Sequence, residues 1–476
     1  MAIVHDSKKA CAVNPLKMSQ PLGACYAFLG LASTMPMMHG SQGCTSFGLV
    51  LLVRHFKEAI PMQTTAMNEV STILGGMDNI EQAVLNIKKR ANPALIAIAS
   101  TGLTETKGDD VDGYLRLIRA KHAETLDGTE IVYVSTPDYV GAFQDGWAAA
   151  IKALVAAFVT PAETRVTGRI GVLPGAHLTP ADLEEVRELI EAFGLDAVLV
   201  PDVSGSLDGH IPEDFTPTTL GGATLDDIRG LGACEHVIAI GEQMRGAVER
   251  LEAIGVPCTL FDRLTGLTAT DALVALLMRL SGKPAPARLK RQRGQLQDAM
   301  LDGHFHLGGK RVAIGAEPDL LFALSSLIAE MGGEVAAAVT TTHSPLLVRV
   351  PTEEVLVGDL EDLEMRAVGC DLLITHAHGR QAATRLGIPL FRAGIPQFDR
   401  IGTAHQLSVG YRGTRDLIFQ LANIFLAHMH AHGPEDWPLP AEAVAAAQGQ
   451  SAAGCGCASS SCSSVSDEVV IPIIPA

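Results

Sequence analysis

The sequence predicts an α/β protein of three domains with mainly parallel sheets, followed by a C-terminal helix and a mobile tail. Three observations predict this organisation. The chain has 476 residues, whereas a single domain takes about 150. Short apolar, β-branched runs alternate with helical patterns over most of its length. Beyond residue 433 the chain is rich in Pro, Ala, Ser, Gly and Cys and has no sustained periodicity.

The strands are expected at the short apolar runs, and helical patterns lie between them. This repeated order is typical of parallel sheets joined by crossover helices. The predicted strands are residues 95–101, 130–137, 169–175, 196–203, 236–241, 311–318, 334–339 and 371–379.

Two complete strand–helix–strand units are visible in the sequence. In the first, Thr179 is placed to cap a helix, Pro180 suits its first position, Asp182 follows three residues after the cap, and Gly194 ends it. The second unit spans 311–339, where apolar residues recur at helical spacing before a pair of glycines. Both units predict a parallel sheet.

The domain boundaries are expected where these patterns are interrupted. One interruption lies near residue 160 and another near 290, in a basic segment that contains prolines. A long helical stretch at 413–432 precedes the change in composition. The predicted units are an N-terminal α/β domain at 1–160, a second domain at 161–290, a third at 291–432 and a flexible Cys- and Ser-rich tail at 433–476.

The composition limits the classes of function. A net charge of −17 at pH 7 argues against non-specific nucleic-acid binding, which needs a field that attracts phosphates. The basic run at 288–294 is interpreted as a solvated helix face or a connector. There is no apolar stretch typical of a secretory signal, and the run at 47–53 is too short to span a membrane. We therefore expect a cytoplasmic protein whose nine cysteines stay reduced.

The usual signatures of enzymes with this architecture are absent. No predicted strand leads into GxGxxG or into a P-loop, and neither HExxH nor GxSxG occurs. The sequence therefore disfavours a dinucleotide, a P-loop nucleotide and catalysis by a familiar constellation of side chains. We expect no independent catalytic activity.

Histidines gather in two places. His376 and His378 follow a predicted strand, at the end where such folds bind ligands, and are either site residues or loop histidines bonded to backbone or water. His428 and His432 lie one helical turn apart and are better explained as an exposed helix end than as a metal chelate.

The cysteines fall into three groups. Four lie in apolar or strand-adjacent contexts and are expected in the core; they are Cys25, Cys234, Cys258 and Cys370. Cys11 lies in an expected N-terminal arm. The tail holds Cys455, Cys457 and Cys462, three thiols in a compliant segment, and their role stays open between metal handling and none.

Cys44 differs from all of these. It lies in the glycine-rich stretch MHGSQGCTSFG at 38–48, which offers backbone N–H donors around one sulfur. Iron–sulfur clusters favour this setting, but a four-iron cluster needs four ligands and the stretch supplies one. From spacing alone, the thiol remains either a cluster ligand or a core residue.

A resemblance to a known family narrows this choice. The segment at 13–76, together with STGLTETKGDD at 100–110 and the long stretches at 264–305 and 387–426, resembles the nitrogenase component 1 family. Within the family it resembles the subunits of the scaffold on which the iron–molybdenum cofactor is matured. The similarity runs from about residue 11 to 430, and it implies three Rossmann-like domains.

Departures from the family's catalytic β chain are informative. That chain carries cysteines in the motifs that here hold Ser19 and Leu103, and only the thiol of Cys44 is kept. Serine is a poor soft-metal ligand at neutral pH and leucine is none, so an eight-iron P-cluster is not expected. The resemblance implies instead a 4Fe–4S cluster at a subunit interface, with Cys44 as the ligand from this side and three cysteines from the partner.

The resemblance also implies partners and a role in nitrogen fixation. It implies an E subunit (NifE) in an α₂β₂ heterotetramer, with a precursor of the iron–molybdenum cofactor held mainly by that partner. Transient partners would be the nitrogenase iron protein (NifH) and the precursor-delivery proteins NifB and NifX. Two alternatives stay open: a catalytic β-type subunit of a nitrogenase or nitrogenase-like reductase, and a small-molecule binding module.

Overall fold

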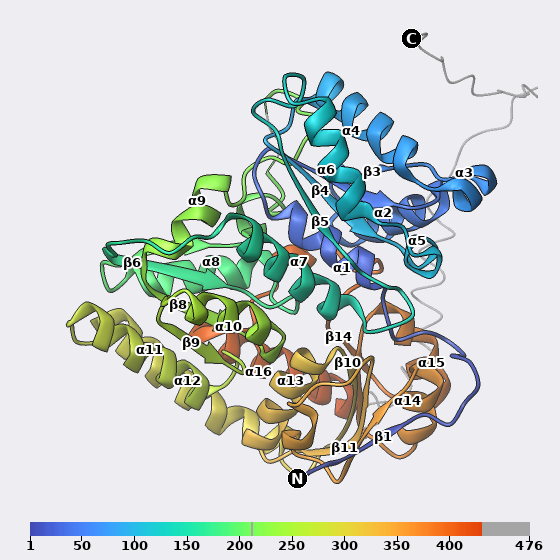
Figure 1. Cartoon of the computed structure of the whole chain (residues 1–476). Helices are drawn as coiled ribbons and strands as arrows, with labels where there is room; N and C mark the ends of the chain where they lie inside the picture. The colour runs from blue at the N-terminus through green and yellow to red at the C-terminus, as the bar shows by residue number, and fades with distance from the viewer. Residues whose placement is uncertain (211–212, 431–476) are drawn as a thin grey trace, which may run out of the picture. The chain divides into compact units, whose positions relative to one another are not determined.

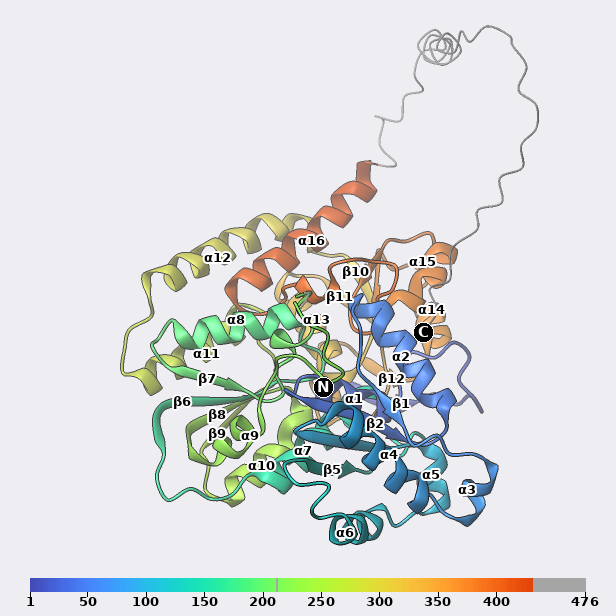
Figure 2. The ribbon, with the colours of Figure 1, turned by 90° about the horizontal axis from the view of Figure 1, so that it is seen from above.

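The computed structural model describes residues 1–210 and 213–430. Residues 1–426 form one compact unit, and a second unit begins at Ala427. The first unit contains three parallel sheets with helices packed on them (Figures 1 and 2). The predicted α/β class with mainly parallel sheets is therefore confirmed.

The first sheet has the strand order β3-β2-β4-β5, and all its pairs are parallel. Strands β2 and β4 are the two central strands of this sheet, and β2 is buried along its whole length. Helix α7 follows β5 and packs against α1, and at Gly23 and Gly146 a Cβ atom would collide with the backbone of the opposite helix. The elements are α1 (Gln20–Leu29), β2 (Thr34–His39), α2 (Gln42–Phe56), β3 (Gln63–Thr64), α3 (Glu69–Leu74), α4 (Met77–Ala91), β4 (Leu95–Ser100), α5 (Gly102–Lys107), α6 (Val111–Lys121), β5 (Glu130–Val134) and α7 (Phe143–Phe158).

The second sheet has the order β7-β6-β8-β9. Helix α8 begins as predicted, because Thr179 accepts a hydrogen bond from the backbone N–H of Asp182 and Pro180 occupies the first position. The elements are β6 (Val166–Leu173), α8 (Pro180–Glu191), β7 (Asp196–Leu199), α9 (Leu225–Gly230), β8 (Cys234–Ile240), α10 (Arg245–Ala253), β9 (Cys258–Phe261), α11 (Leu267–Ser281) and α12 (Ala287–Leu307).

The third sheet has six strands in the order β1-β12-β11-β10-β13-β14. The chain runs outward from β10 in both directions, which makes the end of β10 a point where the strand order reverses. The elements are β1 (Ile3–Asp6), β10 (Arg311–Ala316), α13 (Pro318–Glu330), β11 (Glu334–Thr340), β12 (Glu354–Val357), α14 (Leu360–Arg366), β13 (Leu372–Thr375), α15 (Arg380–Leu386), β14 (Leu390–Arg392) and α16 (Gly410–His430).

The N-terminus departs from the predicted grouping of residues 1–160. Strand β1 pairs with β12 and so belongs to the third sheet. The segment after it is held there by Asp359, whose carboxylate accepts from Lys9 Nζ at 2.5 Å and from the backbone N–H of Val13 at 2.7 Å. Residues 3–6 therefore do not join the first sheet, and the boundaries near 160 and 290 stay predictions.

The eight predicted strands are all present as strands, with ends shifted by a few residues. The basic run at 288–294 lies on α12, as the helix-face interpretation expects, and two of its arginines pair with Glu188 and Asp271. No helix among residues 1–210 and 213–430 is long and apolar enough to cross a membrane.

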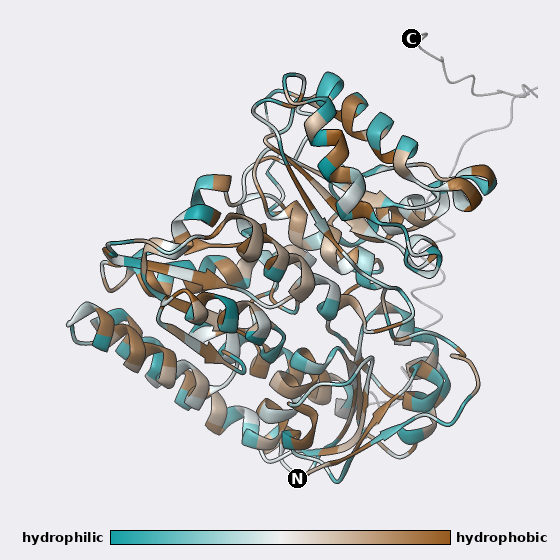
Figure 3. Cartoon of the chain, viewed as in Figure 1, coloured by the Kyte–Doolittle hydropathy of each residue, from teal (hydrophilic) through white to brown (hydrophobic). Residues whose placement is uncertain are grey.

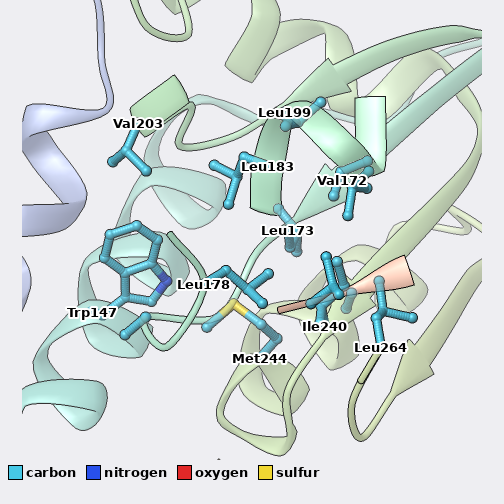
Figure 4. Close-up of a cluster of buried hydrophobic side chains, with 14 of the residues drawn as sticks. Trp147, Val172, Leu173, Leu178, Leu183, Leu199, Val203, Ile240, Met244 and Leu264 are labelled. Atoms are coloured by element: carbon cyan, nitrogen blue, oxygen red, sulfur yellow. The ribbon is translucent and has the colours of Figure 1, made fainter. Parts of the chain in front are cut away.

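The core is aliphatic, as the low aromatic content requires. Figure 4 shows Trp147 of α7 lying among apolar side chains, mainly leucine and valine, from the second sheet, its loops and helix α8. The indole Nε1–H donates to the carbonyl of Pro174 at 2.8 Å, which satisfies its only polar group. Helix α7 thus joins the first sheet to the second. In Figure 3 apolar residues gather on the strands and on inward helix faces, with conspicuous exceptions on α3.

Candidate metal centre

Cys44 is the third residue of α2 and lies in its first turn, which follows the two-residue connection at 40–41 after the last residue of β2, His39. Its side chain is exposed, and its Sγ lies 3.5 Å from Ser41 Oγ. The first N–H groups of a helix have no partner within the helix and carry partial positive charge. The sulfur therefore stands at a helix end that favours an anionic group.

A buried polar network holds the turn before Cys44. His39 Nδ1 lies 2.9 Å from Thr65 Oγ1, which also accepts from the backbone N–H of Gly40 at 3.0 Å. Thr101 Oγ1 donates to the carbonyl of His39 at 2.9 Å. Burial lowers the pKa of His39 to about 4, although Asp109 opposes the shift, so the imidazole is neutral at physiological pH. The turn is thus held by side chains from separate segments around the first sheet.

Cys44 borders a hollow of about 610 Å³. The hollow lies between the start of α1, the start of α2, the loops after β4 and β5, and the turn after β13. Polar or charged residues that line it are Asn14, Lys17, Ser19, Cys44, Thr101, Asp138 and His378. The size is in the range of small-molecule and cofactor sites.

Of the two positions that depart from the family pattern, Ser19 lines this hollow and Leu103 does not. Ser19 lines it and is the N-cap of α1, where its Oγ accepts from the backbone N–H of Leu22 at 3.4 Å. Leu103 lies in α5, two residues after Thr101, and is 36% exposed. Neither side chain is a soft-metal ligand. Cys44 is therefore the thiol that the described residues offer at the hollow.

The two histidines after β13 have different surroundings. His376 is buried, its Nε2 lies 3.1 Å from the carbonyl of Leu16, and its Nδ1 accepts from the backbone N–H of His378 at 3.3 Å. Burial lowers its pKa to about 4. His378 lines the same hollow as Cys44 and packs edge-on against Phe398. His376 thus supports the turn, and of the two only His378 lines the hollow.

Gly43 precedes Cys44 and also lines the hollow. Its backbone does not need glycine, since it lies inside α2 and is not among the residues with positive φ. A Cβ atom there would meet only Ser41 Oγ, at 3.9 Å, which is an ordinary contact. The fold of this chain alone would thus accept alanine, and the open space beside Gly43 fits a group that approaches from outside.

The remaining cysteines of the described residues are free thiols. Cys25, Cys234 and Cys370 are buried, as predicted, and Cys258 is half-buried. Among the described residues, no group of three or more His, Cys, Asp or Glu side chains is arranged to hold a metal ion. His432 and the tail thiols at 455, 457 and 462 lie outside the described residues.

A second cavity, of about 100 Å³, lies between the carboxyl ends of β6, β9, β10 and β14. It is lined by Glu317, whose pKa burial raises to about 8 although the backbone N–H of Gln144 donates to it at 3.2 Å. Burial raises the pKa of the neighbouring Asp319 to about 7. Sequence reasoning missed this pair, although an acid at the end of the predicted strand 311–318 and another directly after it were a signal for it.

Comparisons with known proteins identify the family of this chain. The family profile of nitrogenase component 1 type oxidoreductases matches residues 19–426, so the chain belongs to that family. A solved structure titled "Nitrogenase Cp1 at pH 6.5" superposes with a TM-score of 0.85 at 32% identity, over 92% of this chain and 98% of the other. The fold and the family are thus established together.

Within the family, the chain is similar to several proteins that share the name NifN. It is 56% identical to the nitrogenase iron-molybdenum cofactor biosynthesis protein NifN of Bradyrhizobium diazoefficiens, over 92% of this chain and 95% of that protein. It is 48% identical to the NifN protein of Nostoc sp., over 90% of this chain and 96% of that protein. The similarity therefore spans nearly the full length of both relatives.

Proposed function

We propose that this chain is a scaffold subunit for biosynthesis of the iron–molybdenum cofactor in nitrogen fixation, and that it works paired with an E-type subunit. The observation that carries the proposal is near-full-length similarity, at about half of all positions, to the NifN proteins of Bradyrhizobium and Nostoc. The cofactor precursor is held mainly by the partner, because the cavity of this chain at the carboxyl ends of β6, β9, β10 and β14 has a volume of only about 100 Å³ and no thiol in its lining.

Cys44 would supply one ligand to a 4Fe–4S cluster shared with that partner. The thiol is exposed at a helix N-terminus, Gly43 leaves space beside it, and a hollow opens next to it. Thiolates are the ligands that such clusters require. When bound, the cluster accepts and donates single electrons. One sulfur cannot retain it, so the remaining three ligands would have to come from the partner subunit.

The surface next to Cys44 supports a stable contact with another subunit. Phe47, Val50 and Val53 follow Cys44 along α2 at helical spacing and are 70%, 52% and 37% exposed. A contiguous apolar helix face that continues from a ligand to a shared cluster fits a partner that completes the site. Binding of a cluster across this boundary would add to the interface energy.

The outer face of helix α12 supports the proposal that two copies of this chain contact each other in an α₂β₂ assembly. This face carries exposed Lys290 near the N-terminal end, exposed Asp302 near the C-terminal end, and Leu301 and Phe305, which are 62% and 77% exposed. Neither Lys290 nor Asp302 has an ion-pair partner within the described chain. In an antiparallel contact between two copies, the basic end of one helix would face the acidic, apolar end of the other.

The exposed apolar residues of helix α3 support the proposal that a transient partner binds there. Val70, Ile73 and Leu74 are 61%, 79% and 81% exposed on this short helix, which contacts α5. In Figures 1 and 2, α3 lies at the rim of the first sheet's domain, on the same side as α2 and α5. A small apolar patch on the same side as α2, the helix that carries Cys44, fits a weak, repeated contact, such as that with the iron protein NifH. The delivery proteins NifB and NifX would be further transient partners.

The proposal is tested by replacing Cys44 with alanine in the complex co-expressed with its partner and purified without oxygen. We expect loss of the four-iron electron paramagnetic resonance signal and of the corresponding iron. Cys11→Ala is the matched control, because Cys11 is also an exposed free thiol but lies in the N-terminal segment. An unchanged iron content and spectrum in Cys44→Ala would refute the assignment.

A second candidate is a catalytic β-type subunit, which the 32% identity to the solved nitrogenase structure favours. Ser19 and Leu103 count against it, because neither side chain can replace a thiolate as a ligand to iron. Reduction of dinitrogen or acetylene at nitrogenase-like rates by the purified complex would decide in its favour.

A further inference from the structure

Ser41 has an unusual role for a helix N-cap. It precedes α2 with extended backbone angles, φ −73° and ψ 158°, which are typical of an N-cap residue. An N-cap serine ordinarily accepts a hydrogen bond from a backbone N–H of the first turn. The Ser41 side chain accepts none. Its Oγ lies instead 3.5 Å from the sulfur of Cys44.

Ser19 provides an internal comparison. It is the N-cap of α1, and its Oγ accepts from the backbone N–H of Leu22, three residues later. Cys44 is likewise three residues after Ser41. The same residue type at the same helix position thus caps one helix and contacts a side-chain sulfur in the other. Loss of a serine cap destabilises a helix. Helix α2 is therefore less stable at its N-terminus than it would be if Ser41 capped it.

We propose that the Ser41 hydroxyl donates a hydrogen bond to the Cys44 sulfur and thereby raises the reduction potential of the cluster bound there. This inference rests on the proposed function. A metal-bound thiolate has no proton, so in that state the hydroxyl is the donor and the sulfur the acceptor. Reduction by one electron adds negative charge to the sulfurs. A donor to a sulfur stabilises the reduced state more than the oxidised state.

The expected size of the effect follows from the charge on the sulfur. A hydrogen bond to an ionised acceptor is roughly twice as strong as one between neutral groups. Only part of its energy differs between the two oxidation states, because the added electron is shared over the cluster. We therefore expect Ser41→Ala to lower the equilibrium constant for reduction about tenfold, which corresponds to about 59 mV for one electron.

The test is a redox titration of the purified complex, followed by electron paramagnetic resonance, for wild type and four variants. Ser41→Ala should lower the midpoint potential, whereas Ser41→Thr, which keeps the hydroxyl, should stay near wild type. Ser46→Ala is the matched control, because Ser46 is an exposed serine on the same helix two residues after Cys44. Leu103→Ser tests whether a hydroxyl added two residues after the lining residue Thr101 has the same effect, and we expect none.

Equal midpoint potentials for Ser41→Ala and Ser46→Ala would overturn the proposal. Loss of iron from both Ser41→Ala and Ser41→Thr would also overturn it, because the side chain would then be required for its shape. A measurement on the cluster-free chain separates these results from failure of the proposed function. There, Ser41→Ala should slow alkylation of Cys44 by iodoacetamide, followed by peptide mass spectrometry, because alkylation proceeds through the thiolate form and this form loses its hydrogen-bond donor. An unchanged rate would overturn the hydrogen bond itself.

Discussion

The substitution Gly43→Ala tests whether glycine at this position is required for cluster binding and not for folding of the chain. Alanine at Gly43 adds one methyl group whose nearest neighbour is Ser41 Oγ, at 3.9 Å, so nothing in this chain has to move. Glycine is less favourable than alanine inside a helix by about 0.5–1 kcal/mol. We therefore expect the isolated chain to gain up to about that much stability, seen as a higher midpoint in urea unfolding.

The same methyl group projects into the hollow beside Cys44. If a cluster and a partner subunit occupy that space, the co-purified complex should lose iron severalfold while the chain itself becomes more stable. Gly246→Ala is the matched control, because Gly246 is the second residue of α10, as Gly43 is of α2, and its Cβ would meet Lys152 Cδ at an ordinary 3.5 Å. A full iron complement in Gly43→Ala would refute the claim that this glycine makes room for a cluster.

Three further predictions concern the surfaces and the buried acids. Ile73→Asp should weaken binding of the iron protein to the complex, measured by calorimetry, without changing its iron content; unchanged affinity would contradict the role given to α3. Lys290→Glu and Asp302→Lys should each shift the complex from tetramer to heterodimer in sedimentation, and together they should restore it; a tetramer in both single variants would exclude α12 from the contact. The third prediction concerns Glu317, whose pKa is about 8 in the folded chain and about 4.5 in the unfolded chain. Between these two pH values the side chain is protonated when the chain is folded and ionised when it is unfolded. Wild-type stability should fall as pH rises through this window, by at most about 1.36 kcal/mol per pH unit from this group. Glu317→Gln should reduce the decline between about pH 6.5 and 8 in urea unfolding, and an equal decline in both proteins would show that Glu317 does not cause it.

The sequence was most informative where strands are β-branched and helices have clear ends. The run at 95–101 and the capped helix after Thr179 are examples, and both appear in the structure at nearly the predicted positions. Strand β2 was missed, although it leads into the Cys44 turn, because its sequence TMPMMH contains a proline and methionines in place of β-branched residues. Its burial between neighbouring strands, which a local pattern does not reveal, overrides this weak propensity.

The sequence singled out a candidate ligand, whose role stays a prediction, and it did not predict the shape of the hollow beside it. Cys44 was singled out by its glycine-rich surroundings and by the family resemblance. That Ser19, Thr101 and His378 line one hollow with it depends on packing between segments more than 300 residues apart, such as the contact of His376 with Leu16. The turn of Ser41 toward the sulfur depends on a single side-chain rotation, which sequence patterns do not encode.

The central claim is that this chain supplies one ligand to a cluster completed by its partner. The most direct test is the iron content and spectrum of the chain purified without oxygen, once alone and once co-expressed with the E-type subunit. We predict no stable four-iron cluster in the chain alone and one for each pair of chains in the complex. A four-iron cluster retained by the isolated chain would contradict the account.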